Sequence, residues 1–119
     1  MCRYLVVRSD DRFTRAVATP VVTEFLLSIA GLRQVSARSY HGLDATVQVL
    51  LLRCDQAGNY AVHTDQPPPE NINRVELVCS CQGPQRYDEW QGLARRIAGF
   101  LAWEVVDDES DEILLRGRR

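Results

Sequence analysis

Long apolar runs are missing from this sequence. Nothing in its 119 residues approaches the roughly 18 consecutive apolar residues of a membrane-spanning helix. The residues from Met1 to Tyr4 lead directly into an apolar stretch, without the charged, apolar and small-residue regions of a signal peptide. We therefore expect a soluble, cytoplasmic protein without a membrane partner. Its four cysteines are expected to be reduced there: Cys2, Cys54, Cys79 and Cys81.

Surplus positive charge is missing as well. The formal net charge is −2, whereas a protein that neutralises many phosphates needs an excess of basic residues. Nucleic acid is therefore not an expected partner. Lysine is absent, so all 14 basic residues are arginine, which is the better bidentate partner for carboxylates and phosphates. Because exposed arginine is mostly a solvated surface charge, we attribute this bias to a GC-rich genome.

The motifs of phosphate, zinc and nucleophile chemistry are also missing. The seven glycines form neither G-x-G-x-x-G nor a Walker pattern. The cysteines and histidines lack the paired spacings of a zinc site. No Gly-x-Ser-x-Gly sequence marks a catalytic serine. We therefore expect no cofactor and no metal, and the sequence identifies no catalytic residue.

What the sequence does contain is typical of one globular domain. Its apolar fraction of 45% and charged fraction of 25% are ordinary for such a domain. A chain of this length buries roughly two-thirds of its unfolded surface, so it needs no disulfide or metal to fold. We expect a single domain over residues 1–119.

Two helices are predicted from the spacing of apolar residues. The first begins at Thr19 and Pro20, because Thr is a good N-cap and proline suits the first helical position. Gly31 is expected to end it. Its apolar stripe has the helical spacing and consists of Val22, Phe25, Leu26 and Ile29. The second helix is predicted over residues 85–102, with the stripe Trp90, Leu93, Ala94, Ile97 and Leu101.

Strands are predicted around these helices. The best is 74–81, in which Val75, Leu77, Cys79 and Cys81 share one face at the two-residue period. The apolar run 47–54 is expected to be covered on both faces and to form a hairpin with 60–64. The loop 66–71 contains three successive prolines and is interpreted as a stiff connector. The other predicted strands are 3–8, 32–40 and 103–106, and the short apolar run 113–115 follows the acidic residues near the end of the sequence.

This order of elements predicts an α+β fold. Two amphipathic helices need one shared apolar sheet face to bury their stripes. We therefore expect a mixed, mainly antiparallel sheet of five to six strands, with both helices packed on one face and with 3–8 and 74–81 at the centre. The element order resembles the ferredoxin-like βαββαβ plan with an added strand. That resemblance covers most of the chain but implies no particular activity, because this plan carries many unrelated functions.

The densest charge cluster is acidic and consists of Asp107, Asp108, Glu109, Asp111 and Glu112. It lacks the spacing of a calcium loop, and nothing marks a pair of catalytic carboxylates. We interpret it as a solvated turn between two short strands, with an acidic docking patch for a basic partner as the alternative. Gly92 and Gly99 each weaken the second helix by about 1 kcal/mol. A helix face that carries them and Arg95, packed on the sheet or on another chain, is a further candidate interface.

The cysteines and histidines leave two interpretations open. Cys79 and Cys81 point the same way about 7 Å apart, which is too wide for an easy disulfide. We expect core packing for the cysteines, with metal or redox use that includes Cys54 and His63 as the alternative. His41 and His63 are expected to be ordinary surface or edge residues, with a Cys–His nucleophile pair as the alternative.

Three hypotheses for function follow. We favour a non-enzymatic protein-binding module from a bacterium, of which an immunity-type toxin inhibitor is a concrete version. The resemblance to such inhibitors is one of general type, since many are small, acidic, cytoplasmic α/β domains. The second hypothesis is a small enzyme with Cys79 or Cys81 as nucleophile and His63 or His41 as base. The third is a homo-oligomeric subunit that pairs through a sheet edge or a helix face.

Overall fold

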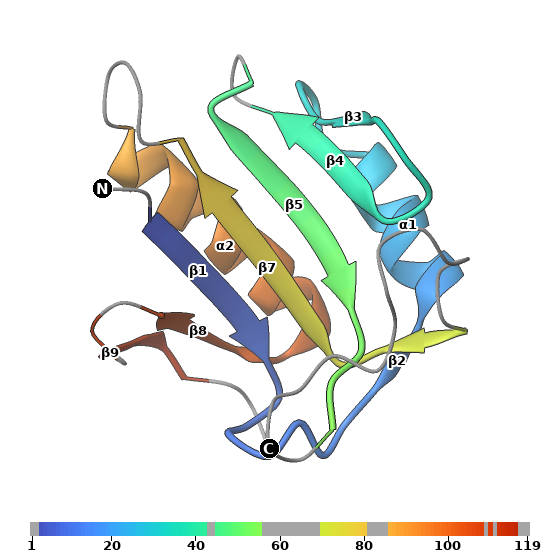
Figure 1. Ribbon diagram of the computed structural model, residues 1–119, viewed down its shortest axis with the longest axis vertical. Helices are drawn as coiled ribbons and strands as arrows, with labels where there is room; N and C mark the ends of the chain where they lie inside the picture. Colours follow the sequence, from blue (N-terminus) through green and yellow to red (C-terminus); the bar gives the residue numbers. More distant parts are fainter. Residues whose placement is uncertain are drawn as a thin grey trace.

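The structure of the protein, a computed structural model, describes residues 3–42, 45–55, 70–80, 86–108, 110 and 112–116. Seven strands form its main sheet: β1 (Arg3–Arg8), β3 (Arg33–Gln34), β4 (Ser39–Gly42), β5 (Val47–Leu52), β7 (Arg74–Cys79), β8 (Glu104–Asp107) and β9 (Glu112–Leu115). Their order is β3-β4-β5-β7-β1-β8-β9 (Figure 1). The short strands β2 (Val17–Ala18) and β6 (Asn71–Ile72) pair separately.

The sheet differs in two ways from the sequence-based expectation of five to six strands in a mixed sheet. It has seven strands, and every pair of neighbours within the described residues is antiparallel. The stretch 32–40 is not one strand, because the chain turns back where the N–H groups of Val35 and Ser36 donate to the Ser39 carbonyl at 3.0 and 3.2 Å. The predicted strand 60–64 and the prolines at 67–69 lie outside the described residues.

The prediction of inner strands at 3–8 and 74–81 is confirmed for β1 and for β7, which ends at Cys79, while Cys81 lies outside the described residues. β7 is the middle strand of the seven and pairs with β5 on one side and β1 on the other, while β8 lies beyond β1. This arrangement puts β1 parallel to β5, and β7 parallel to β8, with one strand between the members of each pair. A helix lies in the connection within each parallel pair: α1 (Thr19–Leu27) in the first and α2 (Tyr87–Leu101) in the second.

The two helices begin close to the predicted positions. Thr19 is the first residue of α1 rather than its N-cap, which is Ala18, and the N–H of Thr19 donates to the Glu70 carbonyl at 2.9 Å. α1 ends at Leu27, and Gly31 lies in the turn that follows with a φ of 84°. α2 ends at Leu101 and is capped by Ala102, whose left-handed conformation lets the N–H of Trp103 donate to the Ala98 carbonyl at 3.0 Å.

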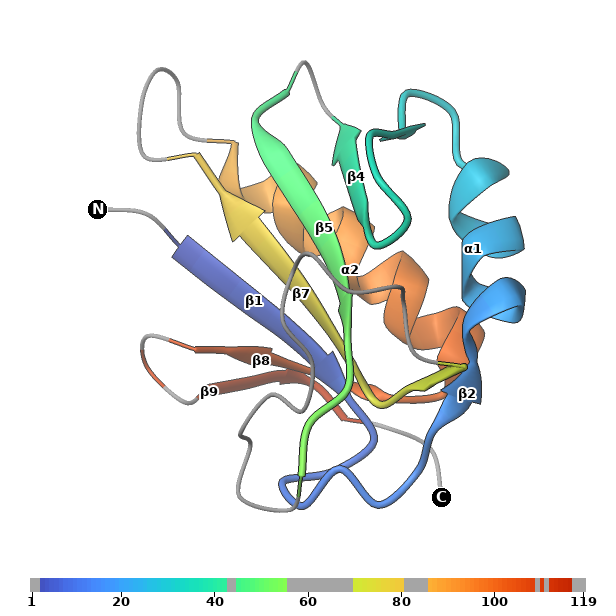
Figure 2. The ribbon, with the colours of Figure 1, turned by 45° about the vertical axis from the view of Figure 1, so that its right-hand side comes forward.

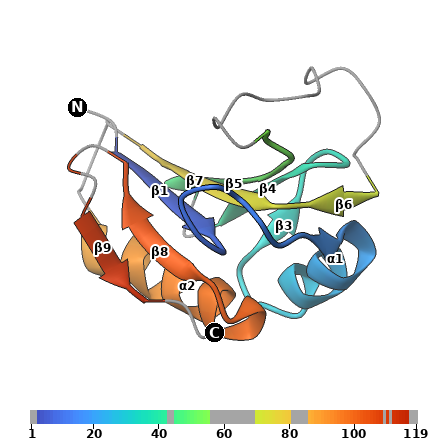
Figure 3. The ribbon, with the colours of Figure 1, turned by 90° about the horizontal axis from the view of Figure 1, so that it is seen from below.

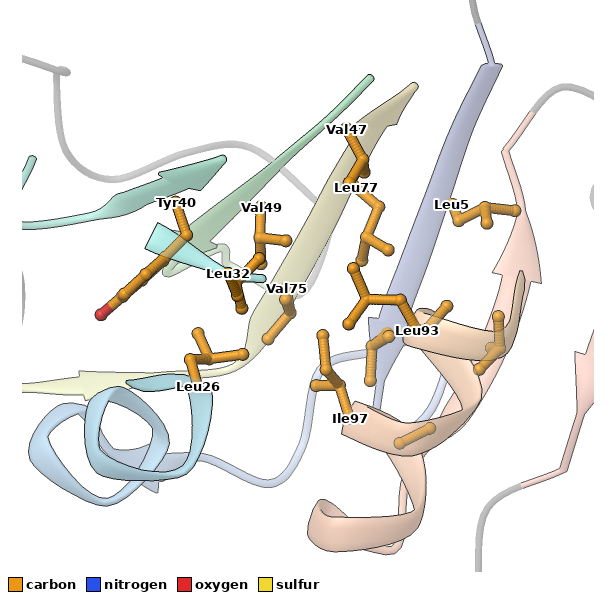
Figure 4. Close-up of a cluster of buried hydrophobic side chains, with 14 of the residues drawn as sticks. Leu5, Leu26, Leu32, Tyr40, Val47, Val49, Val75, Leu77, Leu93 and Ile97 are labelled. Atoms are coloured by element: carbon orange, nitrogen blue, oxygen red, sulfur yellow. The ribbon is translucent and has the colours of Figure 1, made fainter. Parts of the chain in front are cut away.

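Both helices cover the same face of the sheet, as the sequence predicts. Figure 3 shows α1 and α2 together on one side of the strands. Alternate residues of each strand face the helices, because the side-chain period of a strand is two. Figure 4 shows Leu26 of α1 and Leu93 and Ile97 of α2 pointing toward these strand residues, which include Leu77 and Val49. All five side chains belong to one buried apolar cluster.

The opposite, helix-free face carries paired charges among buried and half-buried apolar side chains, such as Val6 and Val78. Arg8 and Glu104 lie 2.9 Å apart, and Arg74 and Glu76 lie 3.4 Å apart. Both guanidinium groups lie 5.9 Å from the ring centroid of Phe13. The predicted covering of β5 on both faces is complete only on the helix side, because its residues alternate between buried ones on that side and half-buried ones on this side.

One buried polar group in the core has an energetic consequence. Tyr40 of β4 is 0% exposed, and its hydroxyl has no hydrogen-bond partner among the described residues. A buried polar atom without a partner costs about 1–3 kcal/mol of desolvation free energy. The ring itself fills the space between β4 and α1 beside Leu26 and Leu32 (Figure 4).

We expect Tyr40→Phe to raise the free energy of unfolding by about 1 kcal/mol, because it removes the desolvated hydroxyl and keeps the ring. Urea denaturation of both proteins measures the change. Tyr40→Ala serves as the control and should lower stability by about 3–5 kcal/mol through the cavity that it leaves. A Tyr40→Phe protein that is less stable than wild type would show that the hydroxyl is hydrogen-bonded.

Candidate functional site

A solvent-open groove lies between the two helices. Val21, Glu24, Phe25 and Ser28 of α1 line one wall, and Phe100 of α2 lines the other. Its volume is about 380 Å³. These five residues define the interhelical groove, and Figure 2 shows the two helices, α1 in blue and α2 in orange, from which they come.

The helical period explains why these side chains stay outside the core. Val22 and Leu26 of α1 face the sheet and are fully buried. Successive residues of a helix are rotated by about 100°, so Val21 and Phe25 lie on the flank of α1 beside that buried stripe. On α2, Phe100 lies outside the buried stripe in the same way. The two flanks meet and form the groove.

The centre of the interhelical groove is an exposed aromatic pair. The rings of Phe25 and Phe100 stack with their centroids 4.0 Å apart and an angle of 8° between their planes. Phe100 is 47% exposed and Val21 is 45% exposed, so apolar surface remains in contact with water on both walls. Single exposed apolar residues are common, but adjoining ones mark a contact surface.

Opposite charges flank this apolar centre. Glu24 is the only charged residue of α1 and lines the groove. Arg96 precedes Phe100 by four residues on α2, and this spacing puts the two on the same side of the helix. Neither Glu24 nor Arg96 forms an ion pair with any described residue. Both charges are therefore available to a partner.

The structure splits the acidic cluster that the sequence singles out. Asp107 is 3% exposed, and its carboxylate accepts hydrogen bonds from Arg3 at 2.9 Å and from the Tyr87 hydroxyl at 2.7 Å. Asp108 and Glu112 are exposed at the β8–β9 turn. Glu109 and Asp111 lie outside the described residues. Asp107 is therefore an internal structural group, and only its neighbours offer charge to the surface.

Asp107 connects the first residues of β1 and α2 to the end of β8. The guanidinium of Arg3 lies 4.3 Å from the ring centroid of Tyr87, in addition to its bond with the carboxylate. Burial and the hydrogen bond donated to Asp107 raise the pKa of Tyr87 above its ordinary value. The Arg3 guanidinium, the Tyr87 side chain and the Asp107 carboxylate thus stabilise one another at the rim of the core.

The second candidate interface of the sequence is the face of α2 around Arg95. Arg95, Gly92 and Gly99 are all exposed, and Arg95 forms no ion pair with a described residue. A methyl group added to either glycine would have no atom within 4 Å. Of the two predicted reasons for these glycines, close packing on the sheet is wrong, because they face away from it, and close packing on another chain stays a prediction.

Described cysteines and histidines do not meet. Cys79 pairs with Val47 in the β5–β7 ladder, and its side chain is on the helix-covered face. His41 pairs with Gln48, so the two-residue period puts it on the opposite, helix-free face. Cys54 lies beyond the other end of that ladder, past Leu52. The described residues therefore contain no Cys–His pair, and His63 and Cys81 lie outside them.

Both described thiols are buried and hard to ionise. Burial raises the pKa of the Cys79 thiol from 9.0 to about 12, with a smaller lowering by Arg3. Burial also raises the pKa of Cys54 above its ordinary value. The Asn73 side chain holds the backbone of Cys54 at both its N–H (2.7 Å) and its carbonyl (2.8 Å). These thiols are packed as small apolar groups rather than prepared as nucleophiles.

Metal-binding clusters and membrane-spanning helices are both absent from the described part of the chain. No three His, Cys, Asp or Glu side chains gather closely enough to hold a metal ion. None of the helices there combines the length and the apolar character needed to cross a bilayer.

Fold and site together define the class of this protein: a two-layer α+β protein with an apolar groove in its helix layer. No protein-family model, no curated protein and no solved structure matches the chain significantly. The groove residues themselves therefore carry the functional argument.

The sequence pattern does not indicate the groove, because each of its residues fits an ordinary position on an amphipathic helix. The spacing of apolar residues puts Phe25 in the core stripe of the first helix. In the structure, Phe25 is only half-buried at the edge of that stripe. Phe100 lies outside the apolar stripe of the second helix, and the sequence pattern predicts no contact for it. A large aromatic residue outside a helix's apolar stripe is the signal that could have indicated an exposed contact.

We expect alkaline pH to destabilise the protein partly through Cys79. The folded protein keeps the thiol proton up to a pKa of about 12, whereas the unfolded chain loses it near 9.0. The contribution to stability is therefore complete below pH 9.0 and decreases as the pH rises toward 12. Urea unfolding of wild type and Cys79→Ala under reducing conditions, at pH values below and above 9.0, measures this loss of stability. Wild type should lose more unfolding free energy than Cys79→Ala, and equal losses would contradict the assignment.

Proposed function

We propose that this protein is a soluble, non-enzymatic protein-binding module that contacts its partner through the interhelical groove. The observation that carries the proposal is the Phe25–Phe100 stack with exposed carbon at Phe100 and Val21, together with Glu24 on the α1 wall, which makes no ion pair with a described residue. Aromatic residues are enriched in the centre of protein interfaces, where they fill pockets of the partner.

The chemistry of the groove supports a protein partner better than a reaction. Its walls offer apolar carbon, one carboxylate and one hydroxyl, from Glu24 and Ser28. A general acid or base needs a positioned substrate and a matched pKa, and a covalent catalyst needs an activated nucleophile. None of the five groove residues is a histidine, cysteine or lysine. An apolar side chain of a partner, inserted beside the phenylalanines, fits this surface.

Two finer interpretations belong to the same proposal. We propose that β5, β7, β1 and β8, with α1 and α2, form a ferredoxin-like unit to which the outer strands are added; the strand order and the two helical connections support this. We also propose a bacterial, cytoplasmic setting and the role of an immunity-type inhibitor. The small size and the net charge of −2 support that role, and the exposed Asp108 and Glu112 would add attraction for a basic toxin.

A matched pair of variants tests the groove as a binding surface. Val21 and Val35 are 45% and 44% exposed, but only Val21 lines the groove. Val21→Asp puts a carboxylate into the groove near the N-terminus of α1, where acidic residues do not weaken a helix. We expect the product of a neighbouring gene, co-expressed with the tagged protein, to be retained by wild type and by Val35→Asp and reduced at least about tenfold by Val21→Asp.

Isothermal calorimetry with the purified partner then measures the affinities. Circular dichroism spectra that match wild type confirm that both variants are folded. A partner that binds Val21→Asp and Val35→Asp equally would remove the groove from the proposal. If no protein, including a second copy of this chain, binds at micromolar concentration, the binding-module function itself is wrong.

The alternative of a cysteine-dependent enzyme has its own test. Because burial raises the pKa of both described thiols, we expect iodoacetamide at neutral pH to leave Cys54 and Cys79 unmodified in the native protein and to modify them after unfolding. Peptide mass spectrometry locates the label. Rapid native labelling of Cys79 would reopen the enzyme hypothesis.

A further inference from the structure

The charges beside the interhelical groove have a definite arrangement. The acid, Glu24, is on the α1 wall, and the base, Arg96, is on the α2 side. Glu24 adjoins Phe25 in the chain, Arg96 lies one helical turn from Phe100, and the two rings stack on each other. From this spacing we infer the order acid, apolar centre, base across the two helices. Neither charge is neutralised by a described residue of the same chain.

A surface with this arrangement is complementary to itself. In a contact with two-fold symmetry, the same patch is used by both copies, and each residue faces the equivalent region of the other copy across the axis. An axis through the phenylalanine pair would bring Glu24 of each chain toward Arg96 of the second copy. The apolar centres would meet on the axis. A partner with charge of a single sign would attract one wall and repel the other.

We infer that the interhelical groove is the contact surface of a symmetric homodimer of this chain. The inference rests on the proposed function, because it names a second copy as the protein that the groove binds. The charge complementarity carries it, and the exposed apolar surface supplies the attraction that the charges orient.

The molecule is large enough for such a contact. A stable interface buries about 800 Å² on each partner, which is just over a tenth of the 6955 Å² surface of this chain. With extents of 35 × 29 × 24 Å, the protein offers that area on one broad face. The contact has to extend from the groove along both helices.

A charge-reversal cycle tests the homodimer. Sedimentation equilibrium from about 1 µM to about 1 mM should show wild type moving from the mass of one chain to twice that mass. Glu24→Arg and Arg96→Glu should each weaken dimerisation at least about tenfold, because every substitution occurs twice in a two-fold contact and creates like-charge pairs. The double variant Glu24→Arg/Arg96→Glu should recover to within about threefold of wild type.

Arg95→Glu is the matched control for Arg96→Glu. Both arginines are exposed on α2 and make no ion pair with a described residue, but Arg95 lies about 100° around the helix, away from Phe100. Arg95→Glu should dimerise like wild type. All the substitutions are on the surface, so circular dichroism should show wild-type folding for each.

The possible failures are distinct. A wild-type protein that stays monomeric up to about 1 mM overturns the homodimer. If Val21→Asp nevertheless loses a different partner, the proposed function stands and the groove belongs to that partner. If neither single charge reversal weakens the dimer, or if the double variant does not restore it, the contact lies elsewhere on the protein. Either result also overturns the inference. A monomer with no partner of any kind overturns both proposals.

Discussion

The structure depends on one constraint: two helices have to cover one face of a seven-stranded sheet. Seven strands spaced about 4.8 Å apart span about 29 Å, whereas two helices side by side span about 20 Å. Each helix therefore covers its own part of the sheet and sends large side chains, such as Leu26 and Trp90, into the core. The flanks of the two helices that face each other touch through Phe25 and Phe100. The interhelical groove is the space that remains beside that contact.

Charged side chains are divided between internal and external roles. Asp107 is satisfied by Arg3 and Tyr87 at the rim of the core, and Arg8 is paired with Glu104 on the helix-free face. Several arginines also lie over aromatic rings, as Arg3 does over Tyr87, which suits the planar guanidinium better than a lysine ammonium. The arginine bias of the sequence thus has structural uses beyond solvated surface charge. The charges beside the groove, Glu24 and Arg96, have no such partner among the described residues, and this difference makes them informative about binding.

In the described part of the molecule, the cysteine thiols are buried, whereas several large apolar side chains are exposed. Cys54 and Cys79 are buried with raised pKa values, and the imidazole of His41 lies on the opposite sheet face from Cys79. Apolar carbon, in contrast, is exposed at Val21 and Phe100. An enzyme needs accessible reactive groups, whereas a binding protein needs accessible apolar surface. The exposed apolar carbon at Val21 and Phe100 is what the proposed binding function requires.

Local pattern alone determined the α+β class, the inner strands β1 and β7, and the two helices, because apolar residues at the periods of two and 3.6 state which face of an element is buried. Pattern could not separate β3 from β4, since that turn depends on backbone bonds to Ser39 rather than on glycine or proline. It also could not distinguish Asp107 from Asp108, because burial of the first depends on Arg3 and Tyr87, which are distant in sequence. Only the tertiary structure brings Phe25 and Phe100 together, because the flanks of two helices become neighbours when both pack on one sheet face.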